Sequence, residues 1–243
     1  MKKTTMKNLF LLAGLMTVCA CAINHLNDEK TVITLQTGTD GNPMVISLEK
    51  GPQWSHTIRP GPFVIHIYPQ LVFWAEDQSG NLLKTLYITG ADAKFSKHAS
   101  KKKMGSEFFR ECFPVWSDKV LSSHQELPSS TNPYPDVVTS ATPQSSFDVV
   151  THLGHIKSAI TLYAEINKSG DYNASYTKEN SDWNGQPSVL YSVAIADIRN
   201  GQSYALKPVG HSDVSQNTPV FRAGFENLDT ALEMISEIRV TFR

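Results

Sequence analysis

The segment ITLYAEIN, residues 160–167, sets the pattern for the rest of the chain. Its even-numbered residues are all apolar, and its odd-numbered residues are polar or aromatic. Successive side chains of a strand point to opposite faces, so a period of two predicts a strand with one face in the core. Ile238, Val240 and Phe242 repeat this alternation at the end of the chain.

The same alternation recurs on both sides of residues that favour turns. Leu71–Glu76 and Leu82–Thr89 flank a short stretch rich in Asp, Ser, Gly and Asn, which predicts a hairpin. Val189–Ile198 and Tyr204–Val209 flank Asn200-Gly201, the favoured pair of a type I′ turn. The chain therefore contains about nine or ten predicted strands.

These strands predict a mainly β protein, an antiparallel β-sandwich of immunoglobulin-like character. One or two short helices are expected, since Leu228, Leu232 and Ile235 have helical spacing and Thr230 with Glu233 fits a capping box. A partly open barrel remains an alternative, because the period of two does not distinguish it from a sandwich.

Composition fits one packed domain and excludes other classes. The 243 residues are 40% hydrophobic, so a core can form, and only 19% are charged. Twenty-two basic residues face 23 acidic ones, a balance that gives no electrostatic reason to bind nucleic acid.

The first residues are typical of a secretory leader. Three lysines precede the apolar run Leu9–Val18, which is too short to span a bilayer permanently. The following Cys21 lies where a bacterial lipobox places its lipidated cysteine, and cleavage near Ala20 or Ala22 is the alternative. We expect a lipoprotein signal peptide over residues 1–20, a tether over 21–30 and a single domain over 31–243.

With such a leader removed, Cys112 is the only unmodified thiol, and its aromatic neighbours suggest a small buried side chain. No metal site is predicted, because His152 and His155 lack further ligands at metal-binding spacing. His211, Ser212 and Asp213 contain the side-chain types of a hydrolase triad, but adjacent residues cannot all converge on one substrate atom. The chain is therefore expected to be a redox carrier or a binding protein rather than an enzyme.

The region from about residue 90 to 146 is a long insertion between predicted strands, and an insertion of this length is usually functional or disordered. It ends in DVVTSAT, residues 136–142. On chemistry alone this is a polar turn before a strand. The heptad resembles the acceptor motif of flavin transferases, which is an Asp, two variable residues, Thr or Ser, Gly or Ser, and then Ala-Thr.

A wider resemblance accompanies the heptad. The hairpin PQLVFWAEDQSGNLLKTLYIT (69–89), the Pro114-Val115-Trp116 step and VGHSD (209–213) occur in the order typical of one protein family. The chain resembles that family of bacterial periplasmic proteins and lipoproteins, which are encoded near flavin transferases and PepSY-type membrane proteins. The resemblance covers most of the sequence after Phe63.

The resemblance implies that FMN is joined to Thr142 by a phosphoester. Asp136, Thr139, Ser140 and Ala141 would be the residues that the transferase recognises. Val137 and Ser140 depart from the commoner residues of the motif. Trp116 and Tyr134 lie on the same insertion and are candidates for the wall of the flavin site, whereas Trp116 as a core anchor is the structural alternative.

Two functions follow from these observations. The first is a lipid-anchored extracytoplasmic electron carrier, or accessory domain, whose partners are a flavin transferase and membrane redox proteins. The second is a non-enzymatic surface lipoprotein that binds glycan or protein through aromatic side chains at Tyr172, Tyr176 and Trp183. In both cases the expected location is the outer membrane or cell surface, facing the periplasm or the exterior.

Overall fold

The computed structural model describes residues 30–35, 41, 43–59, 61–89, 106–129, 132, 134, 138–139, 142–156, 158–181, 184–213 and 220–243. The strands are β1 (Thr31–Thr34), β2 (Pro43–Lys50), β3 (His56–Ile58), β4 (Ile65–Ile67), β5 (Gln70–Glu76), β6 (Leu82–Thr89), β7 (Val138–Thr139), β8 (Phe147–His152), β9 (Ile160–Asn167), β10 (Val189–Ile195), β11 (Ser203–Asp213), β12 (Val220–Arg222) and β13 (Ile235–Phe242). The helices are α1 (Ser106–Cys112), α2 (Pro114–Ser122) and the 3-10 turn η2 (Thr230–Glu233).

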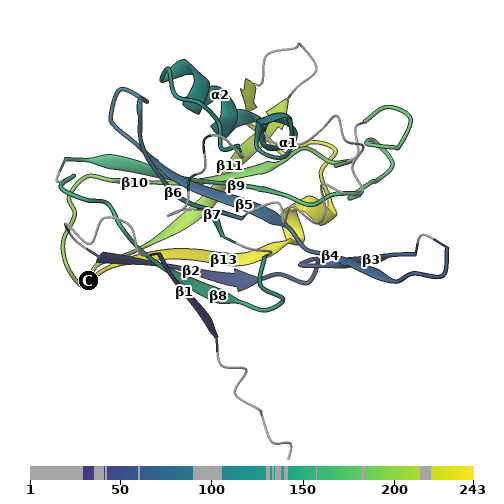
Figure 1. The fold of residues 1–243 in the computed structure, drawn as a ribbon, viewed down its shortest axis with the longest axis horizontal. Helices are drawn as coiled ribbons and strands as arrows, with labels where there is room; N and C mark the ends of the chain where they lie inside the picture. Colours follow the sequence, from purple (N-terminus) through teal and green to yellow (C-terminus); the bar gives the residue numbers. More distant parts are fainter. Residues whose placement is uncertain are drawn as a thin grey trace, which may run out of the picture.

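Eleven of these strands form one curled sheet in the order β1-β8-β2-β13-β11-β10-β9-β5-β6-β7, with β12 paired to β11. Figure 1 shows the sheet folded into two layers, with the two α-helices on the outer side of one layer. The mainly β, sandwich-like fold predicted from the sequence is confirmed.

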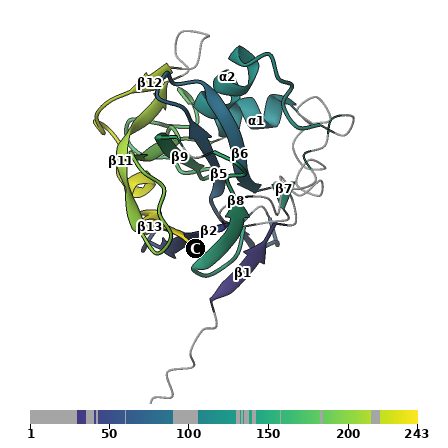
Figure 2. The same ribbon diagram turned by 90° about the vertical axis from the view of Figure 1, so that its left-hand side faces the viewer.

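Strand β11 connects the two layers. Ser203–Leu206 pair with β13 in one layer, and residues 207–211 pair with β10 in the other. Val209 is an extra residue, a bulge in β11 opposite the Leu190–Tyr191 step. Figure 2 shows β11 running along one side of the molecule from β12 to β13. Bulges bend a strand in this way, so a single long strand can serve both layers.

The opposite side of the sandwich is bridged by side chains. Lys84 of β6 donates to the His152 carbonyl oxygen of β8 at 2.7 Å, and Thr151 donates to the Leu86 carbonyl oxygen at 3.4 Å. Each of these two hydrogen bonds links β6 to β8 across the layers.

The main core lies between the two layers, and ITLYAEIN contributes to it as expected. Ile160, Leu162, Ala164 and Ile166 are all buried in this core. The opposite face of the same strand is also covered, because α1 and α2 pack over it around Phe113 and Trp116. Strand β5 is accordingly buried on both faces, which explains its continuous apolar run.

Two helices lie within the insertion at residues 90–146, where no helix was predicted. Phe109, Phe113, Trp116 and Val120 follow one another at helical spacing and are buried together. Pro114 occupies the first turn of α2, a position where its missing N–H is harmless. The length of the insertion and its later Ser/Pro content obscured this short helical pattern.

Two local predictions near turns are also corrected. Gly201 has a positive φ of 81° but Asn200 does not, so the turn is not type I′. The helix expected near Leu228 is limited to η2, and Ile235 already belongs to β13. Asp229, rather than Thr230, caps η2 by accepting from the Thr230 amide.

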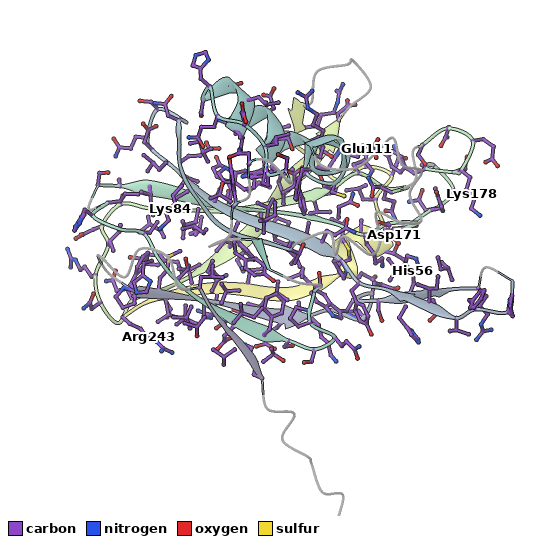
Figure 3. All side chains as sticks on the ribbon, viewed as in Figure 1. His56, Lys84, Glu111, Asp171, Lys178 and Arg243 are labelled. Atoms are coloured by element: carbon purple, nitrogen blue, oxygen red, sulfur yellow. The ribbon has the colours of Figure 1, made fainter. Side chains whose placement is uncertain are left out.

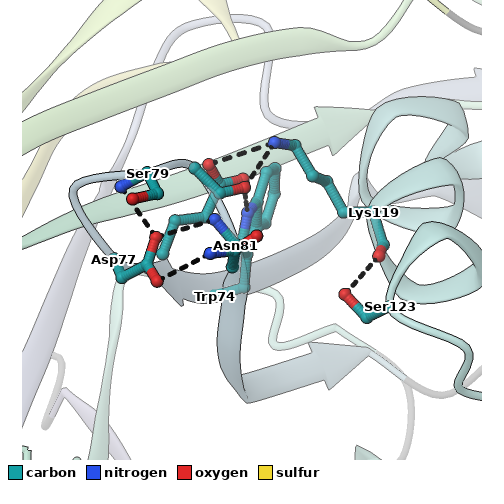
Figure 4. Close-up of polar contacts among 8 residues, drawn as sticks. Trp74, Asp77, Ser79, Asn81, Lys119 and Ser123 are labelled. Carbon is teal, nitrogen blue, oxygen red and sulfur yellow. Dashed lines mark hydrogen bonds and ion pairs between the residues drawn. The ribbon is translucent and has the colours of Figure 1, made fainter.

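Helix α2 is fixed to the β5–β6 hairpin by a lysine (Figure 4). Lys119 Nζ donates to the Gly80 carbonyl oxygen at 2.8 Å and lies 3.3 Å from Glu76 Oε2. The Glu76 side chain is only 5% exposed, and its other oxygen accepts from Trp74 Nε1 at 2.8 Å. The hairpin itself is closed by Asp77, whose carboxylate accepts from the turn amides.

We predict that Lys119→Met lowers the free energy of unfolding by roughly 2 kcal/mol, because the buried Glu76 carboxylate loses its cation. Combining it with Glu76→Gln should recover part of the loss, since the amide is uncharged and still accepts from Trp74. Urea denaturation of both single variants and the double variant measures the coupling. Equal stability of Lys119→Met and the natural chain would contradict this assignment.

Candidate functional site

Buried polar side chains gather at one end of the sandwich. Thirteen polar or charged residues are buried in the described part of the chain, and nine of them lie within residues 165–188 or at 211–212. Burying so many polar groups is costly unless they satisfy one another. This end of the molecule therefore has the strongest claim to a specific role, and it contains two polar networks.

The first network is centred on Glu165, which is fully buried on the helix-facing side of β9. Its Oε2 accepts from the Trp116 amide at 2.8 Å, and its Oε1 accepts from the Val115 amide at 3.2 Å. Both amides belong to the first turn of α2, whose N-cap residue Phe113 makes no side-chain cap. Glu165 therefore supplies acceptor oxygens for the first turn of α2, from a strand 49 residues away in sequence.

Two opposing effects determine the pKa of the Glu165 carboxyl group. Burial raises the pKa of its carboxyl group to about 7, and the hydrogen bonds from Ser188, Trp116 and Val115 oppose that rise. The carboxyl group thus changes charge near neutral pH. A group with such a pKa in contact with a helix terminus is a candidate for proton-linked behaviour.

Two serines extend the network toward β11. Ser188 Oγ donates to Glu165 Oε1 at 2.6 Å and lies 2.7 Å from Ser212 Oγ. The neighbouring His211 directs its Nδ1 to the Ser212 carbonyl oxygen at 2.7 Å, and Asp213 pairs with Arg222. The three hydrolase-type side chains therefore point to separate partners, as expected from their adjacency.

The second network surrounds Lys168, just after β9. Lys168 Nζ donates to the Gln53 carbonyl oxygen at 2.8 Å and lies 3.4 Å from Asp171 Oδ1, and its side chain is 1% exposed. The same Asp171 oxygen accepts from Thr230 Oγ1 at 2.8 Å. Burial lowers the pKa of Lys168, and the carboxylate of Asp171 acts in the opposite direction.

His56 adjoins this network where the β3–β4 hairpin leaves the body, and Figure 3 shows it beside Asp171. Burial and the nearby Lys168 charge lower the pKa of His56. Its Nε2 and Asp171 Oδ2 are buried without a hydrogen-bond partner among the described residues. The chemistry available here is charge compensation between a lysine and an aspartate, with a neutral imidazole alongside.

Thr142, the predicted flavin acceptor, lies at this end of the sandwich. It is half-buried, and its Oγ1 donates to the Pro69 carbonyl oxygen at 2.5 Å. Trp54 Nε1 donates to the Pro143 carbonyl oxygen at 3.2 Å. Pro69 is next to Gln70, which pairs with Asn167 at the end of β9. Trp54 is next to Gln53, whose carbonyl oxygen accepts from Lys168. The hydrogen-bond partners of Thr142 and Pro143 therefore adjoin the Lys168 network.

The predicted flavin wall lies elsewhere. Trp116 is fully buried between the helices and the sheet and donates from Nε1 to Thr85 Oγ1 at 3.0 Å, so it serves as a core anchor and its ring faces no external ligand. Tyr134 is half-buried beside the same core and donates to the Glu126 carbonyl oxygen. No described contact joins either aromatic residue to Thr142.

Several predicted residues lie outside the described residues: Cys21 with the leader, Asp136, Ser140, Ala141 and Trp183. Thr139 is described only through the backbone of β7. Neither α-helix in the described part of the chain is long and apolar enough to span a membrane. Among the same residues, no cluster of three or more His, Cys, Asp or Glu side chains is arranged to hold a metal ion.

Sequence reasoning did not identify Glu165, Lys168 or Asp171 as site residues. Glu165 carried one signal, since it was the only acidic residue in an otherwise uncharged strand pattern. Its partners lie on an insertion that was not predicted to be helical. Comparison with protein-family models, with curated proteins and with solved structures finds no match for this chain.

The pKa of Glu165 generates a pH prediction with a definite sign. The folded chain keeps the proton up to about pH 7, whereas an unfolded chain releases it near pH 4.5. The contribution of the protonated Glu165 carboxyl group to the free energy of unfolding is therefore complete below pH 4.5. It is lost as the pH rises to 7, by roughly 3 kcal/mol in total.

We expect the free energy of unfolding of Glu165→Gln not to fall between pH 4.5 and 7, because the amide does not titrate. Urea denaturation at several pH values between 4.5 and 8 measures it, and Glu237→Gln on the exposed side of β13 is the matched control. If Glu165→Gln keeps the same pH dependence as the natural chain, the assignment to Glu165 is wrong.

Proposed function

We propose that this chain is an exported protein, anchored by lipid at Cys21, that carries FMN esterified to Thr142. In this proposal it serves as an electron carrier, or as an accessory domain, in an extracytoplasmic flavin-based electron-transfer system. The sequence basis is the resemblance of DVVTSAT to the flavin-acceptor motif.

The observation that carries the proposal is that Thr142 is half-buried in the connection that follows the edge strand β7. Strand β7, which contains Thr139 of the motif, ends the sheet order and pairs with β6 alone among the described strands. A transferase must reach both the motif and the acceptor hydroxyl, and an edge strand followed by a half-buried threonine suits this requirement.

The Thr142–Pro143 step also offers a firm attachment point. Esterification replaces the Oγ1 proton, so the hydrogen bond from Thr142 to Pro69 is lost. The hydrogen bond from Trp54 to Pro143 does not involve that hydroxyl and would keep the modified residue in place. When bound, FMN supplies electron relay, and a covalent bond prevents its loss from a protein outside the cytoplasm.

Since Trp116 is buried, other groups must line the isoalloxazine ring. Tyr134 remains a half-buried aromatic on the same insertion. The proposed partners are a flavin transferase, which attaches the group, and membrane redox proteins, which exchange electrons with it.

Intact-mass spectrometry of the exported chain, with and without its co-expressed transferase, tests the attachment. We expect a mass increase equal to FMN less one water, mapped to Thr142 and absent in Thr142→Val. Thr57→Val, which alters an exposed threonine on β3, is the control and should carry FMN at Thr142 to the same extent as the natural chain. An unmodified natural chain in the presence of the transferase, or a modified Thr142→Val, would overturn the proposal.

A second candidate, a surface lipoprotein that binds glycan or protein, is favoured by the loop from Asp171 to Gly185. Asn173 Oδ1 accepts from the Ser175 and Tyr176 amides at 2.8 Å, which orders the loop. Lys178 Nζ lies 5.7 Å from the centroid of the Tyr172 ring. An ordered loop with two tyrosines is a suitable platform for stacking against sugars.

This candidate predicts glycan binding that Tyr172→Ala weakens about tenfold, as expected for loss of one stacking contact. Phe63→Ala, which removes an aromatic side chain that is 68% exposed and lies outside this loop, is the control. A glycan screen followed by titration calorimetry makes the measurement, and a purified natural chain that is yellow and binds no glycan would favour the flavin proposal instead.

A further inference from the structure

The β3–β4 hairpin stands apart from the curled sheet. Its two strands pair only with each other in the described part of the chain, with His56 opposite Ile67 and Ile58 opposite Ile65. Figure 1 shows the hairpin projecting beyond the edge of both layers. Such an isolated ribbon gains little stability from its own strands, so its exposed surface needs an explanation.

The tip of the hairpin is apolar and exposed. Phe63 is 68% exposed, Val64 is 56% exposed and Ile58 is 40% exposed. These three are half of the six large apolar side chains that are exposed in the described residues, although they span only seven positions. Apolar side chains concentrated in this way commonly mark an interaction site.

The ribbon is also amphipathic. Ile58 and Ile65 form a cross-strand pair on one face. On the other face Thr57 Oγ1 and His66 Nδ1 lie 3.2 Å apart and are exposed. Because successive side chains of a strand point to opposite faces, the apolar surface of the tip continues along one face of the ribbon only.

The charges around the tip have one sign. Residues 51–75 contain Arg59, His56 and His66 but no aspartate or glutamate, although the whole chain has 23 acidic residues. Arg59 directly follows the exposed Ile58, at the beginning of the loop that carries Phe63. An apolar tip with a neighbouring guanidinium complements an anionic lipid surface, where the apolar groups enter the interface and the cation meets headgroup phosphates.

The small size of the tip favours a bilayer over a protein partner. A stable protein interface buries roughly 800 Å² on each side, and three side chains at the end of a narrow ribbon provide far less. Shallow insertion into a membrane requires no such area, since burial of a few apolar side chains already gives useful binding.

We propose that the β3–β4 hairpin is a membrane-insertion element that places Phe63, Val64 and Ile58 in the interfacial region of an anionic bilayer, with Arg59 at the headgroups. The proposal rests on the hairpin and not on the flavin. It would add a second membrane contact to a lipid at Cys21 and fix the orientation of the body relative to the membrane.

Vesicle flotation tests the insertion with residues 21–243 carrying Cys21→Ser, so that all variants lack both the apolar run at Leu9–Val18 and the lipid. We expect binding to mixed phosphatidylcholine–phosphatidylglycerol vesicles, and Phe63→Ser should lower the partition coefficient about tenfold. Arg59→Glu should weaken binding to these vesicles but not to pure phosphatidylcholine. The matched control is Phe221→Ser, which removes an exposed phenylalanine from β12.

A spectroscopic readout separates insertion from other causes of lost binding. Tryptophan fluorescence of Phe63→Trp should shift to shorter wavelength on anionic vesicles and be quenched by brominated lipid, whereas Phe221→Trp should show neither effect. Circular dichroism and thermal melting establish that the variants are folded. Unchanged flotation of folded Phe63→Ser, or absence of lipid quenching at position 63, would overturn the proposal, as would a protein oligomer that dissociates in Phe63→Ser without any vesicle binding.

Discussion

The arrangement of the whole molecule depends on one buried carboxylate beneath a helix N-terminus. Glu165 projects from the central strand β9 and accepts from two amides of α2 and from the hydroxyl of Ser188. It therefore links the helical layer, the sheet and the segment leading into β10. In its neutral form a carboxyl group retains a carbonyl acceptor and gains a donor, so the same position is chemically acceptable in both charge states.

This link explains how a strand of mixed character is buried on both faces. The apolar face of β9 packs in the core between the layers, and its polar face is covered by the helices, where the first turn of α2 needs acceptors for its free amides. Trp74 and Tyr163 stack beside it with ring centroids 5.2 Å apart, which fills the space between β5, β9 and α2. The nearby pair of Lys168 and Asp171 is compensated in the same manner, each charge meeting an opposite charge and a hydrogen bond.

Elements that depend on residues close together in sequence were predicted, and elements that depend on contacts between distant residues were not. Strands at 160–167, 71–76 and 82–89 were predicted at their observed positions, because a period of two and the intervening turns are local signals. The α2 helix was missed although Phe113, Trp116 and Val120 have helical spacing, because its polar cap comes from another strand. Long-range polar contacts of this kind leave almost no trace in sequence order.

The candidate site shows the same division. Thr142 was predicted as the flavin acceptor from a local motif, and it lies in the connection between β7 and β8. The expected polar turn is interrupted, because Val138 and Thr139 of the motif form β7. Trp116 was a candidate both for the flavin wall and for the core, and only the packing of α2 assigned it to the core. Lys168 and Asp171 are only three residues apart, but their partners Gln53 and Thr230 come from distant segments. The same holds for Glu165, whose partners lie on α2 and before β10, and sequence order does not reveal such contacts.

The central claim, that Glu165 holds the helical layer on the sheet, is tested most directly by amide hydrogen exchange. The account predicts that Glu165→Ala increases exchange throughout residues 109–122, with the largest effect at the Val115 and Trp116 amides. Exchange in β8, which does not contact this layer, should be unchanged. Full protection of the two amides in a folded Glu165→Ala chain would contradict the account.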